Sequence, residues 1–221
     1  MKSSLGVWLI VAAAGISVSA QQLAPTAPLS RDTLAVPGQP TTPPPGWTLL
    51  ASDAATTASP ASVQRYGPGV RITTLDEGAL FRPAFPLTGD GVVSAVVFVD
   101  ATTPPAYGLT LGGETGRAFL VRAAGAVAIA PLQNRKAVPG TWTSAPAVAT
   151  TSTPSGAVPQ RLEVRVHGVT ADLAVNGVVV ASTPIAAGAL DGVPGVYSGG
   201  PGDLAVAGFS VRTMQRTGPP K

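Results

Sequence analysis

From Trp47 onward the chain alternates short apolar runs with turn-forming residues. Runs that are rich in Val and bounded by Gly, Pro, Asn or Asp indicate β-strands, and many in succession are typical of a sandwich or barrel. The pattern predicts strands near 47–50, 63–66, 69–74, 79–82, 91–99, 106–111, 117–122, 126–130, 161–167, 170–175, 178–183, 194–198 and 204–211. We therefore expect an all-β fold in which two antiparallel sheets pack face to face.

The stretch 161–175 predicts a hairpin with a defined register. Its apolar residues recur at every second position, as in a strand with one buried face. Gly168-Val169 suits a type II′ turn, because Gly accepts the positive φ of the first turn position. This turn places Arg165 opposite Asp172 on the outer face. On the inner face it pairs Val166 with Ala171, Val164 with Leu173 and Leu162 with Val175.

A second turn extends the hairpin to a three-stranded meander. Asn176-Gly177 is the preferred pair for a type I′ turn, and Val178 and Val180 are expected to return on the inner face. The run 91–99 (GVVSAVVFV) is apolar at nearly every position, which predicts a central strand covered on both sides. The stretch 137–160 predicts a long polar, Pro-rich connection with a mobile tip around 150–155.

The composition excludes several classes of function. There is no Cys, so disulfides, thiolate nucleophiles and Cys-ligated zinc are excluded. The formal net charge is +3, and the Arg residues are spread singly along the chain. A nucleic-acid interface needs clustered Lys and Arg with aromatic residues between them, so we expect no nucleic-acid partner.

The N-terminal segment predicts export. Lys2 precedes an apolar run from Leu5 to Ile16, and small residues follow up to Ala20, as in a cleavable signal peptide. An uncleaved membrane anchor is the alternative, but the run is shorter than the roughly 18–20 apolar residues that span a bilayer. We expect a signal peptide at 1–20, a Pro-rich linker at 21–46, a sandwich domain at 47–213 and a disordered tail at 214–221. The mature protein is then secreted or periplasmic and not inserted in a membrane.

Four sequence segments together resemble the concanavalin A-like lectin/glucanase (laminin G-like) superfamily. They are the meander with Val175-Asn176-Gly177, the stretch Tyr107–Gly113 (YGLTLGG), the hairpin 117–131 that turns at Gly125, and the closing pair Gly195-Val196-Tyr197 and Phe209-Ser210-Val211. The resemblance covers about 47–213 and implies a jelly-roll sandwich with a concave face that meets glycans in many relatives. Members commonly close with a Phe-Asp-Asn-Phe-like segment, whereas this chain has Val206-Ala207-Gly208-Phe209. This chain therefore lacks the Asp and Asn side chains of that segment and any role that they have in those members.

The sequence argues against common catalytic arrangements. Glycoside hydrolysis needs two carboxylates facing each other across a cleft, and Glu77, Glu114 and Glu163 are isolated in sequence. A pair assembled from distant strands stays open as an alternative. His167 is the only histidine, and no Gly-x-Ser-x-Gly elbow accompanies it, so we expect a solvated turn residue.

Candidate ligand-binding residues are aromatic and cationic side chains on this framework. Exposed aromatic rings commonly stack on sugars, which makes Trp142 and Tyr107 candidates, with Arg122 as a polar partner. No cofactor is expected, although calcium needs only oxygen ligands, and Asp100 and Asp203 lie at predicted strand ends. Isolated loop aspartates more often cap turns, so these two are weak metal candidates.

The sequence therefore favours an exported, non-catalytic recognition or accessory module. The resemblance makes a glycan or surface polymer its expected partner. Two alternatives remain open at this point: a glycoside-active enzyme with an atypical carboxylate pair, and a structural cell-envelope or surface protein without a small ligand.

Overall fold

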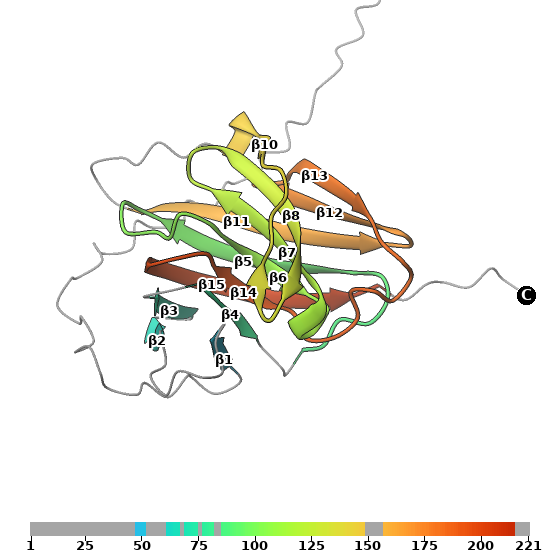
Figure 1. The fold of residues 1–221 in the computed structure, drawn as a ribbon, viewed down its shortest axis with the longest axis horizontal. Coiled ribbons are helices and arrows are strands. Elements are labelled where there is room, and N and C mark those ends of the chain that lie inside the picture. The colour runs from blue at the N-terminus through green and yellow to red at the C-terminus, as the bar shows by residue number, and fades with distance from the viewer. Residues whose placement is uncertain are drawn as a thin grey trace, which may run out of the picture. The chain divides into compact units, whose positions relative to one another are not determined.

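The structure, a computed structural model, describes residues 47–51, 61–66, 69–74, 77–81, 85–148 and 157–214. These residues form strands in two sheets, with two short 3₁₀ turns at Gly113–Thr115 and Pro146–Val148 and no α-helix (Figure 1). None of the described residues belongs to a helix long and apolar enough to cross a membrane. The predicted signal peptide and linker, and nearly all of the predicted tail, lie outside the described residues.

Sheet A contains eight antiparallel strands among the described residues. Seven form a continuous path and β9 pairs separately with β8. In spatial order the strands are β1 (Thr48–Ala51), β4 (Gly78–Phe81), β14 (Gly195–Ser198), β6 (Tyr107–Leu111), β7 (Arg117–Arg122), β8 (Ala126–Gln133) and β10 (Thr143–Ser144), with β9 at Lys136–Ala137.

Sheet B contains seven antiparallel strands within the described part of the chain. In spatial order they are β13 (Val178–Pro184), β12 (Thr170–Val175), β11 (Val158–His167), β5 (Gly91–Val99), β15 (Gly202–Thr213), β3 (Gly69–Thr74) and β2 (Ala61–Tyr66). The chain crosses repeatedly between the sheets, so that neighbours in a sheet are often distant in sequence. The fold is a jelly-roll β-sandwich, and all thirteen predicted strands are present.

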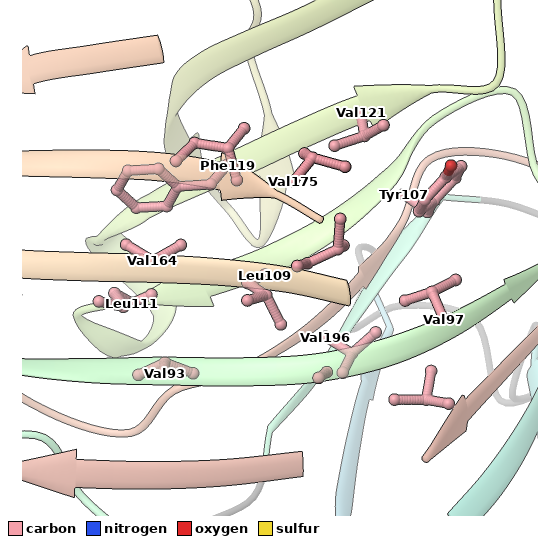
Figure 2. Packing of buried hydrophobic residues seen from close by; sticks show 14 of the residues in the cluster. Val93, Val97, Tyr107, Leu109, Leu111, Phe119, Val121, Val164, Val175 and Val196 are labelled. Carbon is pink, nitrogen blue, oxygen red and sulfur yellow. The ribbon is translucent and has the colours of Figure 1, made fainter. Parts of the chain in front are cut away.

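The inner faces of the two sheets form one apolar core. Figure 2 shows Leu109 and Phe119 of sheet A and Val93 and Val164 of sheet B among the residues of this layer, and each is fully buried. Alternate positions along each strand point inward, as the period of two requires. Burying an apolar side chain of this size contributes about 1.5–3 kcal/mol. Because the chain has no cysteine to cross-link the sheets, this layer holds them together.

The predicted meander register is confirmed in its first hairpin. Val166, Val164 and Leu162 pair with Ala171, Leu173 and Val175, and Arg165 pairs with Asp172. Both turns have the predicted backbone. Gly168 has a φ of 61°, and the Asn176-Gly177 pair has φ values of 51° and 86°.

The second hairpin departs from the prediction at a β-bulge. Leu173 pairs with Ala181 but Ala174 pairs with Val179, so Val180 is an extra residue in β13. Val180 packs partly against the core, whereas Val178 is 53% exposed at the hairpin end of this edge strand. The expectation that both would be buried is therefore wrong for Val178, because an edge strand near its turn has no neighbouring strand to cover it.

Two further elements differ from their sequence-based expectations. The connection 137–160 is not wholly irregular, because it contains β10, the start of β11 and, at residue 137, the end of β9. The mobile tip expected around 150–155 lies outside the described residues. The central strand β5 buries its inner face, but its outward residues Val92, Val96 and Phe98 are only half-buried.

Two buried polar contacts connect the sheets. The hydroxyl of Tyr107 in β6 donates to Oε1 of Gln160 in β11 at 2.6 Å, and Nε2 of Gln160 donates to the carbonyl of Val148 at 2.9 Å. At another point the hydroxyls of Thr74 in β3 and Ser198 in β14 lie 3.0 Å apart. Buried polar groups are costly unless they are hydrogen-bonded, so these pairs favour one relative placement of the sheets.

We predict that Gly108→Ala destabilises the fold by about 1–3 kcal/mol, the usual cost of overpacking a core. A Cβ at this position in β6 would lie 2.0 Å from the carbonyl oxygen of Phe119 in the adjacent strand. The backbone of β7 would have to move. Urea unfolding measures the loss. Gly140→Ala is the matched control, because its Cβ would meet no atom within 4 Å, and its stability should stay within about 0.5 kcal/mol. Equal stabilities of the two variants would contradict the prediction.

Candidate glycan-binding site on sheet A

The outer face of sheet A carries small residues that form a second apolar cluster. Ala118 and Leu120 of β7 lie beside Ala130 and Ala128 of β8 in the antiparallel register. All four are buried although they face away from the main core. Trp142 packs against this cluster as a partly buried member. Three of these four residues are alanines, which leaves room for the Trp142 ring on a floor of mostly small side chains.

The edge of sheet A places Trp142 above this floor. Asn134 and Arg135 both have positive φ, 48° and 67°, and turn the chain back from β8 into β9. The chain then leaves the sheet through 138–142 and pairs with β8 again at β10, which runs beside Val127 and Ala126. An interrupted edge strand of this kind holds the segment before β10, including Trp142, against the sheet.

Arg122 and Trp142 are brought together at this edge. The guanidinium carbon of Arg122 lies 3.8 Å from the centroid of a Trp142 ring, which is cation–π geometry. Arg122 also pairs with Ala126, and Ala126 pairs with Ser144, so the three occupy one row across β7, β8 and β10. Arg122 and Ser144 are exposed. We call the four residues Arg122, Ala126, Trp142 and Ser144 the Arg122–Trp142 corner.

Sequence reasoning identified two of these four residues. Arg122 and Trp142 were candidates on chemical grounds, but their contact joins positions twenty residues apart and depends on how β10 pairs with β8. Ala126 and Ser144 were missed. Neither has a distinctive local pattern, and β10 is only two residues long, too short to show a period.

Tyr107 is not part of this surface. Its side chain is 0% exposed and lies on the inner face of β6, where its hydroxyl binds Gln160. Burial raises the pKa of Tyr107 well above its usual range. The prediction that Tyr107 contacts a ligand is therefore wrong, because a ring inside the core offers no face for stacking. Position 107 falls in the same alternation as Leu109 and Leu111, which is the signal for its burial.

Tyr197 is a second aromatic that the fold removes from solvent. It lies on the outer face of sheet A within the small-residue cluster and is 1% exposed. Its hydroxyl donates to Oε1 of Glu77 and accepts a hydrogen bond of 3.0 Å from the backbone N–H of Ala137. This contact ties β9 to β14 and leaves Trp142 as the aromatic with partial exposure at the corner.

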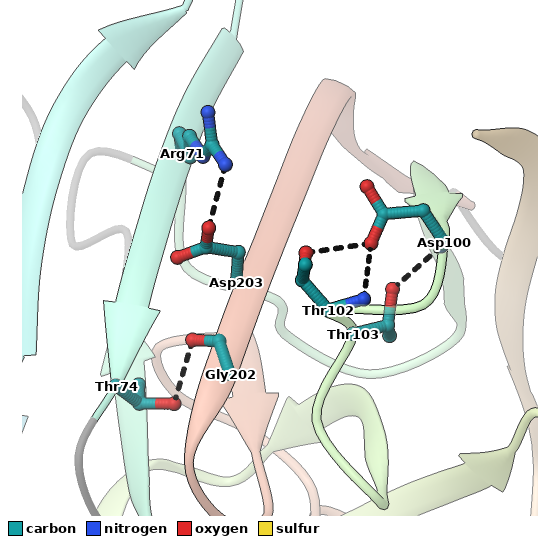
Figure 3. A network of polar contacts seen from close by, with 7 residues as sticks. All are labelled: Arg71, Thr74, Asp100, Thr102, Thr103, Gly202 and Asp203. Atoms are coloured by element: carbon teal, nitrogen blue, oxygen red, sulfur yellow. Dashed lines mark hydrogen bonds and ion pairs between the residues drawn. The ribbon is translucent and has the colours of Figure 1, made fainter. Parts of the chain in front are cut away.

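The two weak calcium candidates serve as structural groups (Figure 3). Oδ1 of Asp100 accepts hydrogen bonds from the backbone N–H and the hydroxyl of Thr102, at 2.7 and 2.6 Å. This is the turn-capping arrangement that isolated aspartates favour. Asp203 forms an ion pair of 2.5 Å with Arg71. The described residues contain no group of three His, Cys, Asp or Glu side chains that would hold a metal ion.

The carboxylates of the described residues are all engaged. Eight of the eleven Asp and Glu residues are described, and each has a hydrogen-bond or ion-pair partner. The pairs are Glu77–Tyr197, Asp90–Gly168, Asp100–Thr102, Glu114–Arg135, Glu163 with Arg161 and Arg165, Asp172 with His167 and Ser182, Asp191–Gly89 and Asp203–Arg71. His167 is exposed beside its turn, as expected, and contacts Asp172 at 2.7 Å.

Glu163 is the most buried carboxylate among the described residues, and its pKa is lowered. It lies on the outer face of β11, as expected, with a side chain 9% exposed between Arg161 and Arg165, each 2.6 Å away. The hydrogen bond from Arg165 lowers the pKa of Glu163, and the charge of Arg161 adds to this against the opposing effect of burial. The carboxylate is therefore held ionised, which suits an ion-pair role and not that of a proton donor.

Comparisons with known proteins relate this chain to others through its fold. No protein-family model matches it, and no curated protein matches its sequence. Among solved structures, the carbohydrate-binding module CBM66 from Bacillus subtilis matches with a TM-score of 0.57 and 10% identity, over 76% of this chain and 95% of that chain. A Bacillus subtilis protein of unknown function with a galectin-like fold matches at 0.53 and 11%, over 75% and 88%.

A third match extends the same class. The exoplasmic/lumenal domain of VIP36, solved in a form bound to Ca²⁺ and Man3GlcNAc, matches at 0.52 and 11% identity, over 81% of this chain and 90% of that chain. At such identities the likeness concerns the fold alone. The chain thus shares the β-sandwich architecture of carbohydrate-binding modules and galectin-like proteins.

We predict that Glu163→Gln lowers stability by about 1 kcal/mol near neutral pH, a value discounted for the exposure of both arginines. Because folding lowers the pKa of Glu163, its contribution is complete above the unfolded pKa of about 4.3 and is lost as the pH falls through the folded value. The stability difference between the two proteins should therefore shrink below about pH 4.

Denaturant unfolding at a series of pH values measures this dependence. Glu114→Gln is the control, because the Glu114 side chain is 53% exposed and its ion pair with Arg135 is 3.3 Å long, so its removal should change little. A constant difference between wild type and Glu163→Gln at every pH would contradict the ionised state.

Proposed function

We propose that this chain is an exported, non-catalytic carbohydrate-binding module that contacts glycans with the Arg122–Trp142 corner. The observation that carries the proposal is a half-exposed Trp held beside an exposed Arg on a floor of small residues. Glycan sites generally combine apolar surface with a few fixed polar groups. The corner offers the guanidinium, the Ala126 methyl group and the Ser144 hydroxyl in one row of strands, with the indole of Trp142 beside the guanidinium.

Three further facts support this proposal. Solved structures of the same fold include a carbohydrate-binding module and a domain bound to Man3GlcNAc. The signal-peptide pattern at 1–20 supports export, the compartment in which a glycan-binding module meets its ligands. The resemblance of segments in 47–213 to concanavalin A-like domains points to the same ligand class.

The carboxylate pattern favours a binding module over a glycoside hydrolase. A hydrolase of the usual type needs one carboxyl group as acid and another as base or nucleophile, both facing the substrate. The described carboxylates are engaged in turns and ion pairs, and Glu163 and Asp203 are held by arginines. The Ala-rich outer face is the observation that favours the second candidate function, a structural surface protein without a small ligand.

A glycan array probed with the full chain tests the proposal. We expect binding to a defined set of glycans, and we expect Trp142→Ala to weaken it by about tenfold or more, since replacing a hot-spot Trp by Ala commonly costs about 2 kcal/mol or more. Ala126→Gln places a larger side chain between Arg122 and Ser144 without removing a core contact and should weaken binding in the same way. Phe85→Ala removes another exposed aromatic, 45% exposed and outside the corner, and should bind like wild type.

Thermal unfolding of each variant separates lost binding from lost folding. A folded wild-type chain that binds no glycan would support the structural alternative. Glycan binding that survives both Trp142→Ala and Ala126→Gln would place the site elsewhere. Release of reducing sugar from a bound glycan would instead identify an enzyme.

A further inference from the structure

The cation of the Arg122–Trp142 corner has no acidic partner among the described residues. The ion pairs of the described chain involve Arg71, Arg135, Arg161, Arg165 and His167, and none includes Arg122. Arg122 is nevertheless fixed in place by its contact with the Trp142 ring. Arg65, Arg117, Lys136 and Arg212 also lack an acidic partner among the described residues, and what distinguishes Arg122 from them is that its guanidinium lies over an aromatic ring.

The contact with Trp142 leaves the hydrogen-bonding edges of Arg122 available. A guanidinium stacks through its flat face, whereas its five N–H donors lie in its plane and point outward. The stack therefore orders the group without consuming its donors. Pre-ordering of this kind lowers the entropic cost of binding an anion.

The surrounding segment is positively charged. Residues 117–144, which form the two hairpins of this edge, contain four Lys and Arg side chains and no Asp or Glu. Glu114, just before this segment, pairs with Arg135 at 3.3 Å. The outer face of sheet B differs, because its Arg161, Arg165 and Arg71 each contact a carboxylate. The edge of sheet A therefore carries an excess of positive charge that attracts an anionic ligand, and Arg212 is an exposed arginine of sheet B that likewise has no described ion pair.

The row Arg122–Ala126–Ser144 sets the size of the subsite. Adjacent strands lie about 4.8 Å apart, so the backbones of Arg122 and Ser144 stand about 10 Å apart with the methyl group of Ala126 between them. That span suits a single sugar ring lying on Ala126. A charged substituent of that sugar would meet the Arg122 guanidinium beside Trp142, and a hydroxyl group would meet Ser144.

We infer that the Arg122–Trp142 corner selects acidic sugars, in which a carboxylate or sulfate group accepts hydrogen bonds from Arg122. This inference rests on the proposed glycan-binding function and specifies its ligand class. Arg forms bidentate, charge-assisted bonds with a carboxylate or a similar oxyanion, and these bonds are about twice as strong as neutral ones. Neutral sugars would keep the contact with Trp142 and Ala126 but would leave the guanidinium without its anion.

The test compares forms of one polymer that carry a carboxylate, a sulfate or no charged group. The full chain is titrated by calorimetry with a polyuronate, with the same polymer after reduction of its carboxyl groups to neutral hexoses, and with a sulfated form of the neutral polymer. We expect the acidic forms to bind about tenfold or more tightly, in line with hydrogen bonds to charged groups. Raising the salt concentration should weaken acidic binding and leave neutral binding unchanged. Preference for the polyuronate over the sulfated polymer identifies a carboxylate as the group bound; the reverse identifies a sulfate.

Charge variants assign the preference to Arg122. Arg122→Gln should abolish the acidic preference, and Arg122→Lys should retain part of it, because the charge remains but the bidentate fork is lost. Arg212→Gln is the matched control: Arg212 is exposed on sheet B, and its loss should leave the preference intact. Equal affinity for neutral and acidic polymers would overturn the inference while the proposed function stands. An acidic preference that survives Arg122→Gln would also overturn it. A wild-type chain that binds no glycan in the array or in these titrations would overturn both.

Discussion

The structure depends on the contact between the inner faces of its two sheets. With no disulfide available, the apolar layer of Val, Leu and a few aromatic residues is what holds the sandwich closed. Few of these side chains are large, so the layer gains its energy from many modest contributions of about 1.5–3 kcal/mol each. Glycine at position 108 allows β6 to approach β7 closely enough for this packing to continue. The buried Tyr107–Gln160 and Thr74–Ser198 contacts then fix how the layers align.

The candidate site follows from the way sheet A ends. A sheet edge exposes unpaired backbone groups and invites pairing with other chains, and proteins usually cover or interrupt such edges. Here β9 and β10 cover the edge of β8 in two short pieces, and the segment between them carries Trp142 onto the outer face. Alanines beneath it leave room for the indole. The two short strands that cover the edge therefore also position Trp142 and form the surface to which we assign the proposed function.

The charged side chains on the outer faces of the two sheets have different partners. On sheet B, Asp172 and Asp203 engage basic or hydroxyl groups on neighbouring strands, and Glu163 engages two arginines of its own strand. On sheet A the segment 117–144 has no acidic residue, and Arg122 is held by a ring instead of by a carboxylate. The proposed binding surface is therefore the one on which an arginine is held by an aromatic ring and has no acidic partner among the described residues.

The sequence by itself determined the strands, the meander register and the candidate chemistry, because these depend on alternation and on turns that a few adjacent residues define. It placed Arg165 opposite Asp172 correctly and selected both Arg122 and Trp142. It missed the bulge at Val180, the burial of Tyr107 and the short strands β9 and β10. Those features arise where residues distant in sequence meet: two residues show no period, and an aromatic side chain carries no local sign of which face it occupies. Only the tertiary structure decided that an arginine stacked on a ring, without a described acidic partner, stands at the edge of sheet A, because the ring belongs to the segment before β10, twenty residues further along the chain.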